Sequence, residues 1–398
     1  MKQPSRWTIL SLIFMLTLAF ALAYQSIPPI LGFIISAFEL SHAQAGALMS
    51  LFALPGIFVS IPGGILANVY GAKRVGVASL ATIFAGTLLV AFSNGFPMLV
   101  AGRILSGIGG MTIAIMAPQT LAQWFAKKNL GMAMGIFHGA VPIMTILTLN
   151  TFGRLAQVSS WELPVLLTSV FSLLALVVFA LKYPAQTPTK GFQKEAGPEF
   201  HKELVGTLRS GWPLWVMALI WMMFNAAAIA YLTFAGDYFV SVGYSIGLPG
   251  FFTSLIMVGG FIFGLLTGLI VDRVGREIFF IAGGSALMAV TIFLIPRSSL
   301  HPWILGSLVG IADGLVPSPT FSLIAKLSPG DQPGSGLALA ATLANVGVLI
   351  GPYLVGLAYD RTLSHRTVLD VIALFALMTA ILALIVPILV RKQKKLVS

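Results

Sequence analysis

Two stretches of this sequence resemble each other and decide the fold. Residues 41–71 read SHAQAGALMSLFALPGIFVSIPGGILANVYG, and residues 245–275 read SIGLPGFFTSLIMVGGFIFGLLTGLIVDRVG. At a constant offset of 204 residues, with no gap, the identical pairs include Ser41 with Ser245, Gly46 with Gly250, Ser50 with Ser254, Leu51 with Leu255, Gly64 with Gly268 and Gly71 with Gly275. Because the copies occupy the same place in each half of the chain, the pattern indicates a duplication.

Long apolar runs recur on both sides of each copy. Hydrophobic residues make up 58% of the sequence and charged residues only 9%, against roughly 25% in soluble domains, so lipid must be part of the solvent. The runs have the length of about 20 residues that a helix needs to span a bilayer, which is too long for barrel strands. We predict an all-α membrane protein with 12 transmembrane helices, near residues 8–30, 44–67, 75–94, 98–122, 131–153, 161–181, 212–236, 248–271, 277–296, 301–324, 335–358 and 367–390.

The loops between these spans are short, with one exception. Residues 182–211 are rich in lysine, glutamate and proline, and we interpret them as a cytoplasmic linker. The sequence therefore predicts an N-terminal six-helix bundle at 1–181, the linker at 182–211, and a C-terminal six-helix bundle at 212–398. Two parallel six-span halves, related by an axis along the membrane normal, are a transporter architecture.

The basic residues indicate how the chain crosses the membrane. With the predicted spans, 18 of the 23 Lys and Arg residues lie on the side of the N-terminus, four lie on the other side, and Arg103 lies inside a span. The positive-inside rule then places both termini in the cytoplasm. The first apolar run could also be a cleaved signal peptide, but the repeat favours a span because this run has a counterpart in the second half.

The second copy of the repeat ends in a short loop of glycines, one acid and arginines. Its residues are Gly268, Asp272, Arg273, Gly275 and Arg276. This loop resembles the signature loop of the major facilitator superfamily (MFS). The first copy is similar, with Asn in place of the usual Asp: its residues are Gly64, Asn68, Gly71, Lys73 and Arg74. The resemblance extends over nearly the whole chain, since it also includes Gly102, Arg103 and Gly107 in the fourth span and Asn345, Gly351 and Pro352 in the eleventh.

The resemblance implies that these loops latch the two halves together when the cytoplasmic side is closed. A carboxylate is stabilised at the positive N-terminal end of a helix. We therefore expect Asp272 to meet the start of the fifth span near Gly131, and Asn68 to meet the start of the eleventh near Gly336. Because Asn68 carries no charge, this contact should be the weaker one. The alternative is that both loops only anchor the topology through their positive charge.

Ionisable residues at membrane depth are candidates for function. Asp313 lies about 18 Å along the tenth span, near the bilayer midplane. Burial favours the uncharged form of a carboxyl group, which suits a proton-coupling site, but a structural carboxylate remains an alternative. Arg103 has either a structural role on backbone carbonyls or a role with anions or protons. His138 titrates near neutral pH or packs as a core histidine.

Several of these polar groups are followed, four residues later, by a proline. Pro28 follows Tyr24, Pro29 follows Gln25, Pro142 follows His138, and Pro317 follows Asp313. Proline cannot donate to the carbonyl four residues before it, so each pair should leave a free carbonyl beside a polar side chain. Such gaps persist in a membrane only next to protein or water. The alternative is that these prolines only kink or end the spans.

We predict a substrate and proton pathway formed by Tyr24, Gln25, Arg103, His138, Asn225, Tyr231, Asp313 and Asn345. In the superfamily that the chain resembles, spans one, four, seven and ten line the cavity, and six of these residues lie on them. By contrast, the glycines at 260, 264 and 268 form a stripe that indicates packing against another helix.

The leading interpretation is a secondary active transporter that moves a small solute by alternating access, coupled to protons. The segment from Trp124 to Trp161 is similar to members that carry organic or inorganic anions, whereas Gly139–Pro142 departs from the drug-export signature. Export of hydrophobic compounds and a transporter-like receptor that does not cycle are the alternatives. No motif for nucleotide binding, catalysis, a cofactor or a metal is present, so we expect no enzyme. We expect a monomer in the plasma membrane, bound to lipid and not to nucleic acid.

Overall fold

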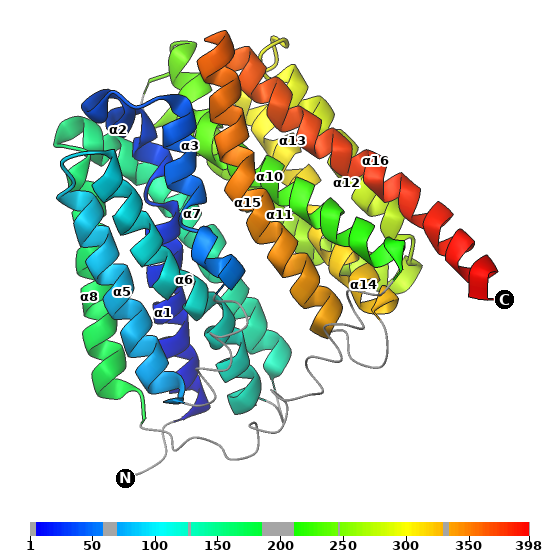
Figure 1. Cartoon of the computed structure of the whole chain (residues 1–398), viewed down its shortest axis with the longest axis horizontal. Coiled ribbons are helices and arrows are strands. Elements are labelled where there is room, and N and C mark those ends of the chain that lie inside the picture. The colour runs from blue at the N-terminus through cyan, green and yellow to red at the C-terminus, as the bar shows by residue number, and fades with distance from the viewer. Residues whose placement is uncertain are drawn as a thin grey trace. The chain divides into compact units, whose positions relative to one another are not determined.

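The computed structural model describes residues 5–58, 70–125, 129–184, 211–245, 247–328 and 334–397, which form helices and no strand (Figure 1). The first half contains α1 (Arg6–Gln25), η1 (Pro28–Ile30), α2 (Leu31–Phe38), α3 (His42–Ser50), α5 (Ala72–Ala91), α6 (Phe96–Phe125), α7 (Leu130–Val158) and α8 (Glu162–Lys182). The second half contains α10 (Trp212–Ser241), α11 (Leu248–Val274), α12 (Glu277–Leu294), α13 (Pro302–Gly314), α14 (Pro317–Leu327), α15 (Gly334–Thr362) and α16 (His365–Val397).

The prediction of an all-α membrane protein is confirmed. Within the described residues, 11 stretches are long and apolar enough to cross a membrane. The second predicted span, 44–67, begins with α3 but lies partly outside the described residues, as does most of the predicted linker 182–211. Large apolar side chains cover the outer faces of α8, α11 and α16, for example Leu181, Leu265 and Leu384. Such a surface suits lipid rather than water.

The first span is longer than the predicted 8–30. Helix α1 ends at Gln25, and the chain then passes through the 3₁₀ turn η1 into α2, so that the apolar span runs from Arg6 to Phe38. The break follows from Pro28 and Pro29, which lack the N–H that would continue the helical ladder. Past the prolines the sequence is again apolar, and a second helix completes the span.

The tenth span is also broken, into α13 and α14. Helix α13 ends at Gly314, and Pro317 begins α14. The proline leaves the Asp313 carbonyl without its helical donor, but this oxygen accepts the Val316 N–H at 3.4 Å instead. The Asp313 carbonyl, which was expected to be free, is therefore hydrogen-bonded within a local turn. Pro142, by contrast, lies inside the continuous helix α7.

The two halves repeat each other in helix boundaries and in packing. Adding the sequence offset of 204 to Leu130–Val158 gives the bounds of α15, Gly334–Thr362. In the first half α1 packs on α7 and α8, and in the second α10 packs on α15 and α16; likewise α5 packs on α6 and α8, and α12 on α13 and α16. The duplication read from the sequence is thus a repeat of three-dimensional structure.

The chain divides into two compact units, which are described separately. The first unit comprises residues 1–40 and 48–197, and the second comprises 41–47 and 198–398. In each unit the first long helix is central: α1 contacts α5, α6, α7 and α8, and α10 contacts α11, α14, α15 and α16. The short segment Ser41–Ala47 belongs with the second unit although its neighbours in the chain on both sides belong with the first, which the sequence did not predict.

Candidate functional site

Arg103 lies in the interior of the first unit, where backbone carbonyls surround its guanidinium. It is 2% exposed. Its Nε donates to the Leu48 carbonyl at 2.9 Å, and its two terminal nitrogens donate to the carbonyls of Ala23 at 2.8 Å and Tyr24 at 3.3 Å. The guanidinium also lies 4.6 Å from the ring centroid of Phe52. The planar fork of arginine suits this arrangement, since three acceptors from two helices converge on one group.

The acceptors of Arg103 are available because α1 ends there. Pro28 cannot donate to the Tyr24 carbonyl, and the guanidinium supplies a donor in its place. The helical donor that the Tyr24 carbonyl lacks is therefore replaced by Arg103, because a buried carbonyl needs a hydrogen-bond partner. The side chain of Tyr24 is 8% exposed and lies against Phe52 at 5.2 Å, and Gln25 is 2% exposed. The structure thus brings Tyr24, Gln25 and Arg103 together at the end of α1.

Asp313 lies in the second unit, near the break between α13 and α14. Its residue is 8% exposed, and among the described residues its side chain has neither an ion-pair partner nor a hydrogen bond. Its carboxylate faces α11: a Cβ added to Gly260 would lie 2.3 Å from Asp313 Oδ2. Neither Tyr24 nor Asp313 therefore points outward from its own unit. An uncompensated buried carboxylate is costly unless it takes up a proton.

The glycine stripe of α11 packs on α13 and α14, as the sequence predicts. A Cβ on Gly264 would lie 3.8 Å from the Gly314 carbonyl oxygen, and one on Gly268 would lie 3.5 Å from Ser318 Oγ. Ser318 Oγ also donates to the Gly264 carbonyl at 3.1 Å. The small residues allow the backbones to approach closely, and this approach confines the Asp313 carboxylate.

The predicted residues of α10 and α15 contact their own helices or remain unpaired. Asn225 Nδ2 donates to the Trp221 carbonyl of the preceding turn at 2.7 Å. The Tyr231 hydroxyl is buried and has no hydrogen-bond partner among the described residues. Asn345 is half-buried on α15. Tyr231 is 0% exposed, and its hydroxyl is the polar group of this set that lies in the core without a partner among the described residues.

His138 is exposed on α7 in the first unit, with its ring against Phe137 at 4.9 Å. No hydrogen bond to its imidazole is found within the described residues. The imidazole is thus not held by a hydrogen bond within the described residues, and the place of His138 in the pathway stays a prediction. Its exposure follows from its neighbours: Gly131 and Gly135, on the same face of α7, have no atom within 4 Å of an added Cβ.

The two predicted latch loops are described to different extents. Gly64 and Asn68 lie outside the described residues, whereas Gly71 ends its loop with a φ of 82° and Gly275 does so with a φ of 68°. Glycine adopts this left-handed region without the cost that a Cβ brings. Lys73 and Arg74 lie in the first turn of α5, and the second loop exposes Asp272, Arg273 and Arg276.

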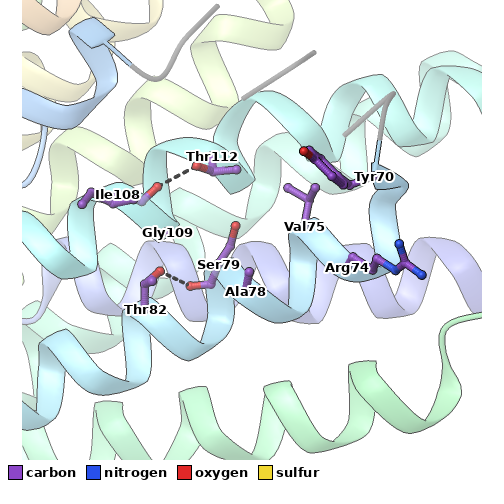
Figure 2. Close-up of a pocket in the computed structure, with 9 residues that line it drawn as sticks. All are labelled: Tyr70, Arg74, Val75, Ala78, Ser79, Thr82, Ile108, Gly109 and Thr112. Carbon is purple, nitrogen blue, oxygen red and sulfur yellow. Dashed lines mark hydrogen bonds between the residues drawn. The ribbon is translucent and has the colours of Figure 1, made fainter. Parts of the chain in front are cut away.

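A cavity of about 350 Å³ opens between α5 and α6, next to the first latch loop. Tyr70 and Arg74 lie at one end of it, and Figure 2 shows the hydroxyls of Thr82 and Thr112 bonded to carbonyls of their own helices. These bonds measure 2.8 Å to Ser79 and 2.7 Å to Ile108. The predicted latch residue Arg74 supplies the charge of the lining, and none of the predicted pathway residues contributes to it.

Several ionic contacts in the second unit involve residues that the sequence did not single out. His42, Asp237, Asp360 and His365 form a cluster with N–O distances of 3.5–3.7 Å. Arg297 forms a two-pronged pair with Asp370, at 2.6 and 2.7 Å, and this hydrogen bond raises the pKa of Arg297. Only the start of α3 carried a readable signal: Ser41 and Gln44 have the spacing of a capping box. The ionic partners are far apart in the sequence, where no local pattern joins them.

A sequence model of the family described as Major Facilitator Superfamily matches residues 13–352 and, in a second match, residues 242–397. This chain belongs to the Major Facilitator Superfamily. The MFS assignment makes it a membrane transporter for small molecules and not an enzyme. The repeat of six helices and the loops at Gly71 and Gly275 are consistent with that family.

Relatives of known or suspected activity are distant in sequence. The human lysosomal dipeptide transporter MFSD1 is 22% identical over 330 residues, covering 79% of this chain and 71% of the human protein. The probable sulfoacetate transporter SauU of Cupriavidus necator is 22% identical over 357 residues, covering 82% and 81%. An uncharacterized MFS-type transporter of Methanocaldococcus jannaschii, MJ1560, is 24% identical over 340 residues, covering 84% and 86%.

A solved structure has the same fold. The crystal structure of a bacterial homolog of the human lysosomal transporter Spinster, in an inward-facing and occupied conformation, matches with a TM-score of 0.78 and 15% identity, over 98% of each chain. The prediction of the twelve-helix MFS fold is confirmed.

Proposed function

We propose that this MFS protein is a secondary active transporter that moves a small acidic solute and uses protons as its coupling ion. The observation that carries the coupling is the carboxyl group of Asp313, which is buried in a broken span with no cation beside it among the described residues. Proton uptake relieves the cost of such a burial, and proton release restores the charge when water or solute arrives. A site of this kind converts a proton gradient into a change of occupancy.

The nature of the solute is supported by the relatives and by the polar groups of the site. A dipeptide and sulfoacetate, the substrates named for two relatives, both carry an acidic group and are small. Sulfoacetate fits the organic-anion or inorganic-anion class that the sequence favours, whereas a dipeptide is a zwitterion and shares only the carboxylate. The unpaired Tyr231 hydroxyl offers a neutral donor for such a group in the core of the second unit.

Arg103 supports the anion proposal less directly. Three of its donors are used by carbonyls of α1 and α3, which favours a positioning role for it within the first unit. This engagement is also what favours the alternative function, export of a hydrophobic compound, because it leaves few charged groups for a solute. Under that alternative Asp313 would still bind the coupling proton.

The proposal also includes the membrane topology of the chain and its oligomeric state. We propose the plasma membrane as the location, with both termini in the cytoplasm, because 18 of 23 basic residues fall on that side of the predicted spans. We propose that the chain acts as a monomer, without nucleic acid, because each half forms a compact unit of its own.

The test of the coupling is transport by purified protein in liposomes. In the Asp313→Asn variant, accumulation of solute driven by a proton gradient should fall to the level of protein-free liposomes, while exchange of labelled for unlabelled solute should persist. Glu162→Gln, which removes an acid in the first turn of α8, is the matched control and should transport normally.

Two results would overturn the assignment. If Asp313→Asn still accumulates solute with the pH dependence of the wild type, the proton is bound elsewhere. If the wild-type protein binds a solute but moves none, the chain is a receptor and not a transporter.

A further inference from the structure

Four titratable side chains from four helices meet at one end of the second unit. His42 Nε2 lies 3.5 Å from Asp237 Oδ2, and His42 Nδ1 lies 3.7 Å from Asp360 Oδ1. His365 Nδ1 lies 3.7 Å from the same oxygen of Asp237. The four side chains are between 17% and 28% exposed, so they are partly shielded from solvent but can still exchange protons with it.

Asp360 caps the first turn of α3. Its two carboxylate oxygens accept the backbone N–H groups of His42 and Ala43, each at 2.8 Å. Ser41 and Gln44 complete the turn as a capping box: the Gln44 N–H donates to Ser41 Oγ at 3.2 Å, and the Ser41 N–H donates to Gln44 Oε1 at 2.9 Å. The donors that a helix start leaves free are therefore satisfied, two of them by a negative charge placed where the helix dipole favours it.

The backbone around this turn packs directly on α15. A Cβ added to Gly46 would lie 2.3 Å from the Pro352 carbonyl oxygen, and one added to Gly356 would lie 2.1 Å from the His42 carbonyl oxygen. The His42 ring also lies 3.7 Å from the ring of Tyr359, measured between centroids. These contacts explain why Ser41–Ala47 belongs to the second unit although the chain on either side of it belongs to the first.

The protonation state of His42 decides whether this cluster is electrostatically balanced. A neutral imidazole has one N–H and one lone pair, so one of its two nitrogens would direct a lone pair at a carboxylate. The imidazolium has an N–H on both nitrogens and suits both Asp237 and Asp360. Two carboxylates without a cation repel each other, whereas one or two imidazolium groups neutralise them.

We propose that His42, Asp237, Asp360 and His365 form a proton-binding site, distinct from Asp313, that holds the segment Ser41–Ala47 on the second unit while His42 is protonated. The groups that face His42 are Asp237 on α10, Tyr359 and Asp360 on α15, and His365 on α16. The ligand is the proton and not a metal ion, since no group of three or more such side chains among the described residues has the geometry to hold one.

The sign of the pH dependence follows from the charges. The Asp360 cap does not involve the imidazole, because its carboxylate accepts from two backbone N–H groups. The contribution of His42 is present while its ring carries an N–H on both nitrogens and is lost in the neutral ring. The segment is therefore held more tightly in mildly acidic solution than in alkaline solution, where the Asp360 cap alone remains. In the proposed topology this cluster lies at the non-cytoplasmic end of α10 and α15, where it would respond to the pH of that side.

Hydrogen exchange of the His42 and Ala43 amides measures the docking directly, because both amides donate to Asp360. In the full-length protein we expect protection of these amides, corrected for the intrinsic exchange rate, to be about tenfold higher at pH 5.5 than at pH 8, the effect of one nearby opposite charge. His42→Gln should lose this pH dependence but keep the fold. Asp360→Asn should lose most of the protection at both pH values.

His301→Gln is the matched control, a histidine of the same unit that caps α13 away from the cluster, and it should behave as the wild type. Direct NMR titration of the His42 ring, with carbon and nitrogen labels, gives a readout that does not depend on any variant. Protection that is the same at both pH values in the wild type, or a pH dependence that survives in His42→Gln, would overturn the proposal. Loss of protection on adding EDTA would also overturn it, in favour of a metal site.

The experiment is independent of transport. A chain in which Asp313→Asn transports normally but the amides of α3 show the expected pH dependence would refute the proposed coupling site and retain this one. If Asp313→Asn loses proton-driven transport but the amides of α3 show no pH dependence, the proposed coupling site is retained and this cluster is refuted.

Discussion

Arg103 illustrates what a single charged residue requires inside a membrane protein. Its charge is compensated by three carbonyl dipoles and an aromatic ring, and no carboxylate of the described residues bonds to it. A helix carbonyl is free to accept from a side chain only where the helix ends or breaks, and the two prolines after α1 cause such an end. Arg103 therefore finds acceptors because the prolines end α1, and the carbonyls at the end of α1 are satisfied because Arg103 donates to them.

A lysine at this position should be a poor replacement. Arg103→Lys keeps the positive charge, but one ammonium cannot reach the acceptors on both α1 and α3, so buried carbonyls lose their donors. We expect a stability loss of about 1–3 kcal/mol, seen as a lower midpoint of thermal unfolding in detergent. Arg154→Lys, at an exposed position of α7, should change stability by less than about 0.5 kcal/mol. Equal midpoints for the two variants would contradict the structural role.

Between helices, the contact of α11 with α13 depends on residues without side chains. Gly260, Gly264 and Gly268 face the tenth span, and the Asp313 carboxylate occupies the room that Gly260 leaves. The repeat gives this arrangement a counterpart in sequence, since Gly56 and Gly64 stand 204 residues before Gly260 and Gly268. The packing of a helix pair thus sets the surroundings of the proposed proton site.

A methyl group at Gly260 should disturb that site. In Gly260→Ala the new Cβ would stand 2.3 Å from Asp313 Oδ2, so the carboxylate or the helix must shift. We expect a stability loss of about 1–3 kcal/mol, together with a changed pH dependence of transport.

The control for this variant is another glycine within a helix. Gly283→Ala lies on α12, where an added Cβ meets no atom within 4 Å, and it should leave stability equal or raise it by up to about 1 kcal/mol. If Gly260→Ala unfolds at the same temperature as the wild type and transports with the same pH profile, the carboxylate is not confined as described.

For the whole molecule, the duplication places one compact bundle in each half of the chain. Each bundle has a central first helix, and the outer faces are apolar. A transporter of this architecture must bind its solute in the folded state and release it again, so solute binding should be visible as stabilisation.

A thermal-shift screen tests the solute class. Small acids such as dipeptides and sulfonates should raise the unfolding midpoint, because a ligand at 100 times its Kd adds about 2.7 kcal/mol to the stability of the state that binds it. Neutral amphiphiles form the comparison set for the alternative of hydrophobic export. A shift with amphiphiles and none with acids would favour that alternative over the proposed solute class.

The sequence by itself determined the membrane class, nearly all of the spans and the superfamily. These features rest on local properties: apolar runs of a fixed length, charges between them, and a repeat that survives at a constant offset. It also predicted the packing of the glycine stripe and the buried positions of Tyr24 and Asp313, because a polar or small residue at membrane depth must face protein.

Only the tertiary structure decided which groups meet. Arg103 finds its acceptors 55 and 80 residues away, and His42 meets Asp360 across 318 residues. The assignment of Ser41–Ala47 to the second unit depends on the same long-range contacts. Hydropathy and motif spacing describe what each segment tolerates locally, whereas an ion pair or a helix cap depends on where the folded chain brings a partner from elsewhere.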